Sequence, residues 1–270
     1  MRVVAAIVLA VALFAAVSVK AQAQGNTFDD GWRAYERGDF STALKTWEEL
    51  AGKGDSRAQF NIGVMYDEGR GVNENMETAI DWWKKAADNG HKHAMHNLGL
   101  AYLFGRGTAI DYTKAVDYFR RAGEAGLAKS QYSLGKMYLS GFGVPRNVSE
   151  GFKWIEKAAM SGVYQAQYNL GKMYRDGEGV GRDEQAAAKW FLAAAEQGYA
   201  RAQNHIGVRL WRGEGLPKNE VEALKWLILA ANQGNELAQQ NRRELAAKLT
   251  PEQRKEAERR ALAFKPKVQT

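Results

Sequence analysis

One spacing dominates this sequence: a Gly-x-Gly triplet recurs every 36 residues, five times in succession. The triplets begin at Gly69, Gly105, Gly141, Gly177 and Gly213. Self-similarity with a period of roughly 20 to 50 residues is typical of repeat proteins, in which each unit buries its apolar face against its neighbours. Because the register never slips, the sequence predicts one continuous array of stacked units and not two separate compact domains.

A first helix is predicted before each triplet. In the first copy Ala58, Ile62 and Tyr66 are spaced four residues apart, so that they share one helix face. The same columns hold Ala94, Leu98 and Tyr102, then Ser130, Leu134 and Tyr138, then Ala166, Leu170 and Tyr174, and finally Ala202, Ile206 and Leu210. Gly63 and its equivalents lie within this helix, where glycine costs about 1 kcal/mol relative to alanine. That cost implies the close approach of another helix.

A second helix is predicted after each triplet. It begins at a column that holds only Asn or Asp, the best side chains for accepting hydrogen bonds from free helix amides: Asn75, Asp111, Asn147, Asp183 and Asn219. It ends at a glycine that can adopt a left-handed cap: Gly90, Gly126, Gly162, Gly198 and Gly234. An aromatic column between small residues (Trp82, Tyr118, Trp154, Trp190, Trp226) is interpreted as inter-helix core, with a sugar-stacking ladder as the alternative.

The unit A-x-x-x-L-G-x-x-Y-x-x-G-x-G-V, followed by D/N-x-x-x-A-x-x-W-x-x-x-A-A-x-x-G, resembles the Sel1-like repeat, a relative of the tetratricopeptide repeat. The resemblance covers about residues 28 to 241 and implies an all-α, right-handed α-solenoid of tandem helix-turn-helix units. Full repeats are predicted at 55–90, 91–126, 127–162, 163–198 and 199–234. A partial repeat precedes them at 28–54, and capping helices at 235–264 and a tail at 265–270 follow.

The first residues differ from the array. Met1-Arg2 is followed by an apolar run from Val3 to Val19 and by Ala21-Gln22-Ala23, the pattern of a secretory signal peptide with cleavage after Ala23. An uncleaved membrane anchor is the alternative. With residues 1–23 removed, no membrane-spanning segment is expected. These features predict a periplasmic or secreted protein of the bacterial cell envelope.

The composition restricts the chemistry. The chain has no cysteine, which excludes a lipoprotein anchor, disulfides and a thiolate zinc site. Residues 24–241 balance 27 basic with 27 acidic residues, and the basic excess appears from Arg242 onward, where nine basic residues face four acidic ones. Because a phosphate-binding face needs a concentrated basic stripe, nucleic acid is not expected as a partner.

Three motifs could carry chemistry, and each has a simpler explanation. Ser133 and Lys136 spell the S-x-x-K motif of penicillin-recognising enzymes, but they occupy variable repeat columns and no K-T-G accompanies them. His91, His93 and His96 lack further partners with metal-ligand spacing, so they are expected at a solvated helix start and to titrate near pH 6.5. The Gly-x-Gly triplets follow helices, not strands, and are interpreted as turns and not as nucleotide-binding loops. No catalytic residue, metal or cofactor is predicted.

The remaining candidate is a stripe on the first helix of each unit, opposite the Ala-Leu-Tyr face. Because its content varies on an otherwise constant scaffold, it suits a partner surface, and in repeats of this family the first helix usually lines the concave side. The predicted contacts are Phe60, Val64, His96, Leu100, Leu103, Tyr132, Lys136, Leu139, Tyr168, Lys172, Arg175, Val208 and Trp211. Tyr132 and Tyr168 could instead pack against the next helix. The sequence thus predicts a non-catalytic scaffold for a protein or extended peptide, with a cell-wall enzyme or a peptidoglycan-binding or polysaccharide-binding module as alternatives.

Overall fold

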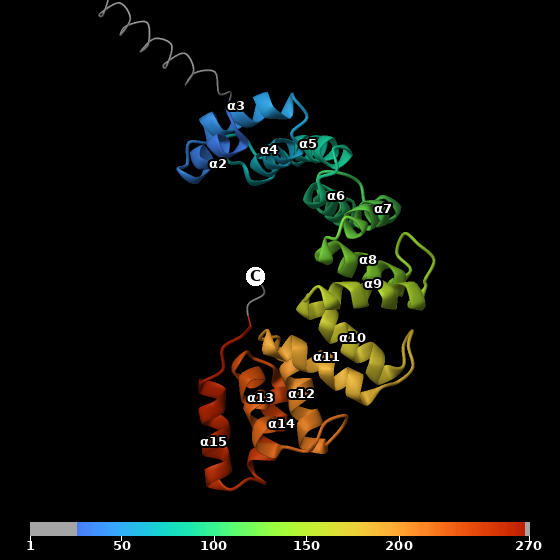
Figure 1. Cartoon of the computed structure of the whole chain (residues 1–270), viewed down its shortest axis with the longest axis vertical. Helices are drawn as coiled ribbons and strands as arrows, with labels where there is room; N and C mark the ends of the chain where they lie inside the picture. Colours follow the sequence, from blue (N-terminus) through green and yellow to red (C-terminus); the bar gives the residue numbers. More distant parts are fainter. Residues whose placement is uncertain (1–25, 268–270) are drawn as a thin grey trace, which may run out of the picture. The chain divides into compact units, whose positions relative to one another are not determined.

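The computed structural model describes residues 26 to 267, which fold into fourteen α-helices without a strand (Figure 1). The predicted signal peptide lies outside these described residues. None of the fourteen helices is long and apolar enough to cross a membrane. The all-α helical-repeat solenoid predicted from the sequence is confirmed.

The chain divides into two compact units, which meet in sequence between Ile110 and Asp111. The first contains α2 (Phe28–Glu36), α3 (Phe40–Ala51), α4 (Ser56–Glu68), α5 (Met76–Asp88) and α6 (Lys92–Phe104). The second contains α7 (Tyr112–Glu124), α8 (Ala128–Ser140), α9 (Val148–Met160), α10 (Tyr164–Asp176), α11 (Glu184–Glu196), α12 (Ala200–Arg212), α13 (Glu220–Asn232), α14 (Glu236–Ala246) and α15 (Pro251–Leu262). The repeat register gave no sign of this division, which falls in a turn between the two helices of one repeat.

The helix ends follow the predicted caps. We call the first helix of each repeat helix A (α4, α6, α8, α10, α12) and the second helix B (α5, α7, α9, α11, α13). Every helix B begins at an Asn or Asp whose side chain accepts a hydrogen bond from a first-turn amide. The glycines that follow helix B all have positive φ, between 80° at Gly90 and 89° at Gly198, as predicted.

The two glycines of each triplet have different tasks. The first ends helix A in the left-handed conformation, as Gly141 does with φ 74°. The second combines positive φ with close packing: an added Cβ on Gly143 would lie 2.2 Å from the carbonyl oxygen of Tyr112, at the start of the preceding helix B. Both features exclude a side chain, so the triplet also locks one repeat against the one before it.

The glycine within helix A allows the predicted close approach of helix B. An added Cβ on Gly171 would lie 2.9 Å from the Phe191 ring, and one on Gly207 would lie 2.8 Å from Leu227. The helix-B residue at this contact lies one position after the aromatic column that the sequence analysis assigned to the inter-helix core. The fully buried column of helix B is Trp83, Phe119, Ile155, Phe191 and Leu227, whereas in the predicted aromatic column only Trp226 is buried and the others are half-buried.

A column of buried glutamines connects neighbouring hairpins. Gln59, Gln131, Gln167 and Gln203 each donate a side-chain hydrogen bond to the last turn of the preceding helix, which is α3 for Gln59 and a helix B for the other three. Their side-chain oxygens can then accept from an amide 30 residues further on, as from Asn89, Gln197 and Gln233. Position 161 holds a serine, and the buried Oε1 of Gln131 has no hydrogen-bond partner among the described residues.

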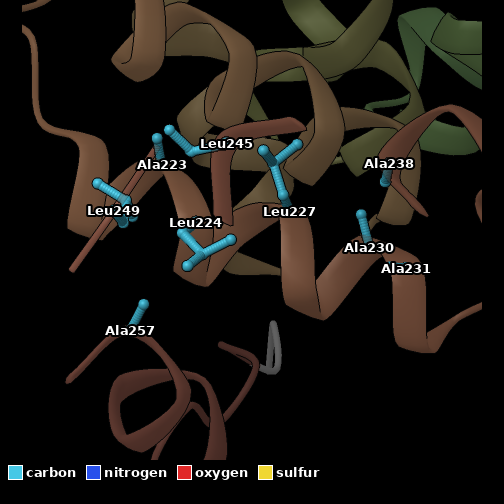
Figure 2. Packing of buried hydrophobic residues seen from close by; sticks show 9 residues of the cluster. All are labelled: Ala223, Leu224, Leu227, Ala230, Ala231, Ala238, Leu245, Leu249 and Ala257. Atoms are coloured by element: carbon cyan, nitrogen blue, oxygen red, sulfur yellow. The ribbon is translucent and has the colours of Figure 1, made fainter. Parts of the chain in front are cut away.

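The C-terminal helices cover the last repeat. Thr250 begins α15 with a capping box and a proline in the first turn. Figure 2 shows the buried side chains of α13, α14 and α15 gathered into one cluster, which includes Leu224, Leu245 and Ala257. Arg242 and Arg243, which replace the Leu-Gly pair of earlier repeats, are exposed. The end of the array is therefore polar, as a terminal repeat requires.

The segment after α15 returns to the body of the second unit. The backbone N–H of Lys267 donates to the Glu196 carbonyl at 2.8 Å, and its ammonium lies 2.7 Å from the Glu196 carboxylate. Phe264 packs edge-on against Trp226 with 5.3 Å between the ring centres. Residues 264 to 267 are thus attached to helices 38 to 71 residues earlier in the chain.

Candidate functional site

In the first unit the predicted contact residues lie on helix A and are half-buried. Phe60 of α4 stacks on the imidazole of His91 with 4.5 Å between ring centres, and His93 lies at the edge of the same group. Val64, His96, Leu100 and Leu103 are also half-buried. This part of the stripe is a set of partly covered apolar side chains and not a freely exposed surface.

His91 differs from the solvated histidine that was predicted. It is the N-cap of α6, where its Nδ1 accepts from the backbone N–H of Ala94 at 3.3 Å. Burial against Phe60, followed by repulsion from His93, lowers the pKa of His91 to about 4. The expected titration near pH 6.5 is therefore wrong for His91, because a protonated Nδ1 could not cap the helix. No group of three or more His, Cys, Asp or Glu within residues 26–267 is placed to hold a metal ion.

In the second unit, side-chain hydrogen bonds join one helix A to the next. The Tyr132 hydroxyl of α8 accepts from the Asn169 amide of α10 at 3.0 Å. Asn204 of α12 accepts from Asn241 of α14 at 2.9 Å. Burial raises the pKa of Tyr132 and of Tyr168, so both hydroxyls remain protonated at neutral pH. Tyr132 and Tyr168 thus pack against the next repeat, which was the alternative interpretation of these residues, and each remains only partly exposed to solvent.

The third connection of this kind involves His205, which the sequence analysis did not single out. Its Nε2 lies 3.3 Å from the Tyr168 hydroxyl, and its ring stacks on Phe191 with 4.7 Å between centres. Burial, reinforced by the positive charges of Arg175, Arg209 and Lys172, lowers its pKa to about 4, against a smaller opposing effect of Asp176. His205 is neutral at pH 7. The sequence signal for His205 was its repeat column, which holds Asn in three other repeats and in the capping helix α14.

Apolar members of the stripe also contribute to packing. Leu139 lies against Gly151 of α9, whose missing side chain makes room for it. Val208 and Trp211 pack at the edge of the cluster that holds Leu224 and Leu245. The Lys248 ammonium lies 4.8 Å from the centre of a Trp211 ring. Trp211 is half-buried, so only part of its side chain is open to a partner, and it stays a predicted contact.

Among the thirteen predicted contact residues, only Lys136 is exposed; the other twelve are half-buried, including Lys172 and Arg175. Arg175 forms two hydrogen bonds with the neighbouring Asp176 carboxylate, at 2.7 and 2.8 Å. Sequence reasoning missed Lys129 and Arg201, which are exposed and lie three residues before Tyr132 and Asn204 in their helices. We call the set formed by Lys129, Tyr132, Lys136, Leu139, Tyr168, Lys172, Arg175, Arg201, Val208 and Trp211 the helix-A surface.

Ser133 and Lys136 interact with different groups. The Ser133 hydroxyl donates to the backbone carbonyl of Lys129, one helical turn earlier, at 3.1 Å. The Lys136 ammonium lies 5.9 Å from the centre of the Tyr132 ring. A serine nucleophile requires a base within hydrogen-bond reach of its hydroxyl. Here the hydroxyl is satisfied by the helix backbone, as is common for serine within a helix.

A buried charge also lies on one of the A helices of the second unit. Arg209 of α12 is only 3% exposed and occupies a column that holds a buried methionine at Met65, Met137 and Met173. Its guanidinium lies 2.6 Å from the Glu184 carboxylate at the start of α11 and 3.3 Å from the Glu214 carbonyl. The hydrogen bond from Arg209, followed by that from Arg182, lowers the pKa of Glu184.

Paired helices that repeat with fixed glycine contacts define the chain as a helical-repeat solenoid protein. The chain belongs to the Sel1 repeat family, whose model matches residues 56–91, 92–127, 128–163, 165–199 and 200–235. Sel1 repeats generally form non-catalytic scaffolds that mediate protein–protein interaction. No curated protein sequence matches the chain.

Two solved structures are similar along most of the chain. One is a protective antigen of uropathogenic Escherichia coli with an SLR fold, which is 29% identical over 91% of this chain with a TM-score of 0.79. This chain spans only 56% of the antigen's length. The other is a Sel1 repeat protein from Oxalobacter formigenes, 29% identical, with a TM-score of 0.76 over 88% of this chain and 100% of that one.

Proposed function

We propose that this protein is a binding scaffold of the bacterial cell envelope, which holds a protein partner on the helix-A surface of its second unit. The observation that carries the proposal is the contrast between a constant framework and one variable surface. The glycines, the caps and the buried column of helix B recur from repeat to repeat. The helix-A surface instead differs in each repeat and combines partly exposed tyrosines with lysine and arginine, which are favourable in partner surfaces.

The structure changes which residues can test this proposal. Truncation of Tyr132 or Tyr168 would remove hydrogen bonds and packing between repeats, so a loss of binding could reflect a loosened scaffold. Lys136 and Lys172 can be replaced with little effect on the core because neither belongs to a buried cluster or an ion pair of residues 26–267. Lys157 and Lys189 on helices α9 and α11 are exposed and provide matched control positions.

The experiment is site-specific photo-crosslinking in the native cell. A photoreactive residue is placed at position 136 or 172, and in control strains at position 157 or 189. We expect a defined crosslinked protein from positions 136 and 172, to be identified by mass spectrometry, and little from the controls. Equal crosslinking from both sets, or crosslinking from the control positions only, would refute the helix-A surface as the binding face.

The envelope location is supported by the sequence of the first 23 residues. Cell fractionation and N-terminal sequencing provide the test. We expect a periplasmic or secreted chain that begins at Gln24. A chain that retains Met1 in the membrane fraction would support the anchor instead, and a chain in the cytoplasm would refute the proposed location.

A further inference from the structure

Charge in the second unit is separated according to helix type. Helices α8, α10 and α12 carry seven basic residues (Lys129, Lys136, Lys172, Arg175, Arg201, Arg209 and Arg212) and a single acidic residue, Asp176. Helices α7, α9, α11 and α13 carry seven basic and eight acidic residues. In the first unit α4 and α6 show no such excess, with two basic and two acidic residues in all. The positive charge is therefore a property of three consecutive A helices.

Most of these cations lie on one face. Lys129, Tyr132 and Lys136 follow one another at three- and four-residue steps, which places them on one side of α8. Electrostatic effects reach across the helices: Arg201 and Arg175 both act on the Tyr168 hydroxyl. Arg209 is the exception, because it is buried against Glu184. The exposed part of the helix-A surface thus collects positive charge from three helices.

Four of these cations form no ion pair with any residue between 26 and 267: Lys129, Lys136, Lys172 and Arg201. Lysines of the B helices, in contrast, are often paired, as Lys153 is with Glu150 at 2.6 Å and Lys225 with Glu222 at 2.7 Å. Helices α8, α10 and α12 also start without a side-chain cap. Their N-terminal amides add partial positive charge to the same three helices.

We propose that the helix-A surface of the second unit binds an acidic, extended protein segment with a carboxylate at about every third residue. This inference rests on the proposed function and adds the chemistry of the partner. Side-chain hydrogen bonds show that α8, α10 and α12 follow one another as direct neighbours. Packed helices lie about 8–10 Å apart, and an extended chain rises about 3.3 Å per residue. Three residues therefore span the distance from one helix to the next.

The side chains of the helix-A surface favour a protein segment over a nucleic acid. The tyrosines are poorly placed for base stacking, because Tyr132 and Tyr168 are half-buried and packed between repeats. Leu139 and Val208 provide partly exposed apolar surface between the charges, which suits the side chains of a peptide.

The test measures binding of a defined probe to the full-length protein by fluorescence anisotropy. The probe is a fluorescein-labelled peptide of twelve residues with Asp at every third position and Ala or Ser elsewhere. A second peptide has Asn in place of each Asp, and a labelled single-stranded DNA of twelve nucleotides serves as the nucleic-acid comparison. The variants are Lys136→Glu/Lys172→Glu on the A helices and Lys157→Glu/Lys189→Glu on the B helices, which change the net charge equally.

We expect the Asp peptide to bind at least about tenfold more tightly than the Asn peptide, and more weakly as salt is raised from 50 to 200 mM. The A-helix variant should lose about tenfold or more in affinity, while the B-helix variant changes by no more than about twofold. Circular dichroism establishes that both variants keep the helical fold.

Three results would overturn the inference: equal binding of the two peptides, an equal loss in the two variants, or tighter binding of the DNA than of the Asp peptide. Failure here is distinguishable from failure of the proposed function. If photo-crosslinking at positions 136 and 172 captures a protein but the Asp peptide does not bind, the surface is a binding face for a partner that is not acidic.

Discussion

The buried ion pair between Arg209 and Glu184 allows a quantitative test of how this repeat tolerates a charge in its core. The equivalent position holds a buried methionine in three other repeats, so Arg209→Met restores the residue that the repeat normally uses. Glu184→Gln keeps the size of the side chain but removes the countercharge 2.6 Å from the guanidinium. The two substitutions should have opposite effects on stability, because only the second leaves a buried charge without its partner.

The magnitudes follow from burial. Loss of one partner of a fully buried ion pair costs about 3–5 kcal/mol. Here the Glu184 side chain is 31% exposed, and Arg209 keeps its hydrogen bond to the Glu214 carbonyl. We therefore expect Glu184→Gln to lower the free energy of unfolding by about 2 kcal/mol, or Tm by roughly 4–8 °C. Arg209→Met should be neutral or stabilise by about 1 kcal/mol.

A double-mutant cycle measured by urea denaturation completes the test. Once Arg209 is methionine, Glu184→Gln removes only the exposed pair with Arg182 and should cost about 0.5 kcal/mol or less. The coupling energy between the two positions is then about 1.5 kcal/mol or more. If Glu184→Gln costs the same in both backgrounds, or if Arg209→Met destabilises by more than about 2 kcal/mol, the reasoning is refuted.

Two further predictions concern contacts between repeats. Because the folded-state pKa of His205 is about 4, below its ordinary 6.5, the unfolded chain binds a proton first as the pH falls. The neutral ring therefore contributes its full stability above about pH 6.5 and loses up to about 3 kcal/mol between pH 6.5 and 4. His205→Asn, the residue common in this column, should reduce the slope of the urea midpoint against pH in that window, where His91 still contributes, and an unchanged slope would contradict the assignment. Ser161→Gln should supply the amide that Gln131 Oε1 lacks, as in three other repeats, and raise the free energy of unfolding by about 0.5–1.5 kcal/mol. Thermal denaturation of Ser161→Gln and of the control Ser161→Ala measures this gain. If Ser161→Gln is no more stable than Ser161→Ala, the oxygen is satisfied in another way.

The sequence predicted the position of the stripe on helix A but not the exposure of its residues. The stripe on helix A was found from its position opposite the Ala-Leu-Tyr face, and the structure places those residues along successive A helices. The exposure of each residue could not be read from the stripe, because it depends on the next repeat. Tyr132 and Tyr168 form hydrogen bonds to residues 37 positions later. Lys129 and Arg201 lie beside the stripe, and a tally of charge by repeat column would have found them.

The charge pattern shows why a count along the chain was not enough. Residues 24–241 hold equal numbers of basic and acidic residues, which argued against a nucleic-acid partner. The excess on the A helices of the second unit is cancelled in that count by acidic residues elsewhere, including those of the B helices. Surface charge depends on which helix face a residue occupies, so its sign emerges only after the chain is folded.

The sequence by itself determined the helical hairpin, its length and its turns. A left-handed backbone, a helix start and a close helix contact each accept few residue types, so Gly143, Gly171 and Asn147 mark their positions unambiguously. Only the tertiary structure decided which side chain fills the contact. Trp82 and Trp83 are about 100° apart around the helix, and the neighbouring helices bury the second more deeply. The attachment of Lys267 to Glu196 and the burial of Arg209 were also decided there, because each depends on a partner distant in sequence, which no local pattern specifies.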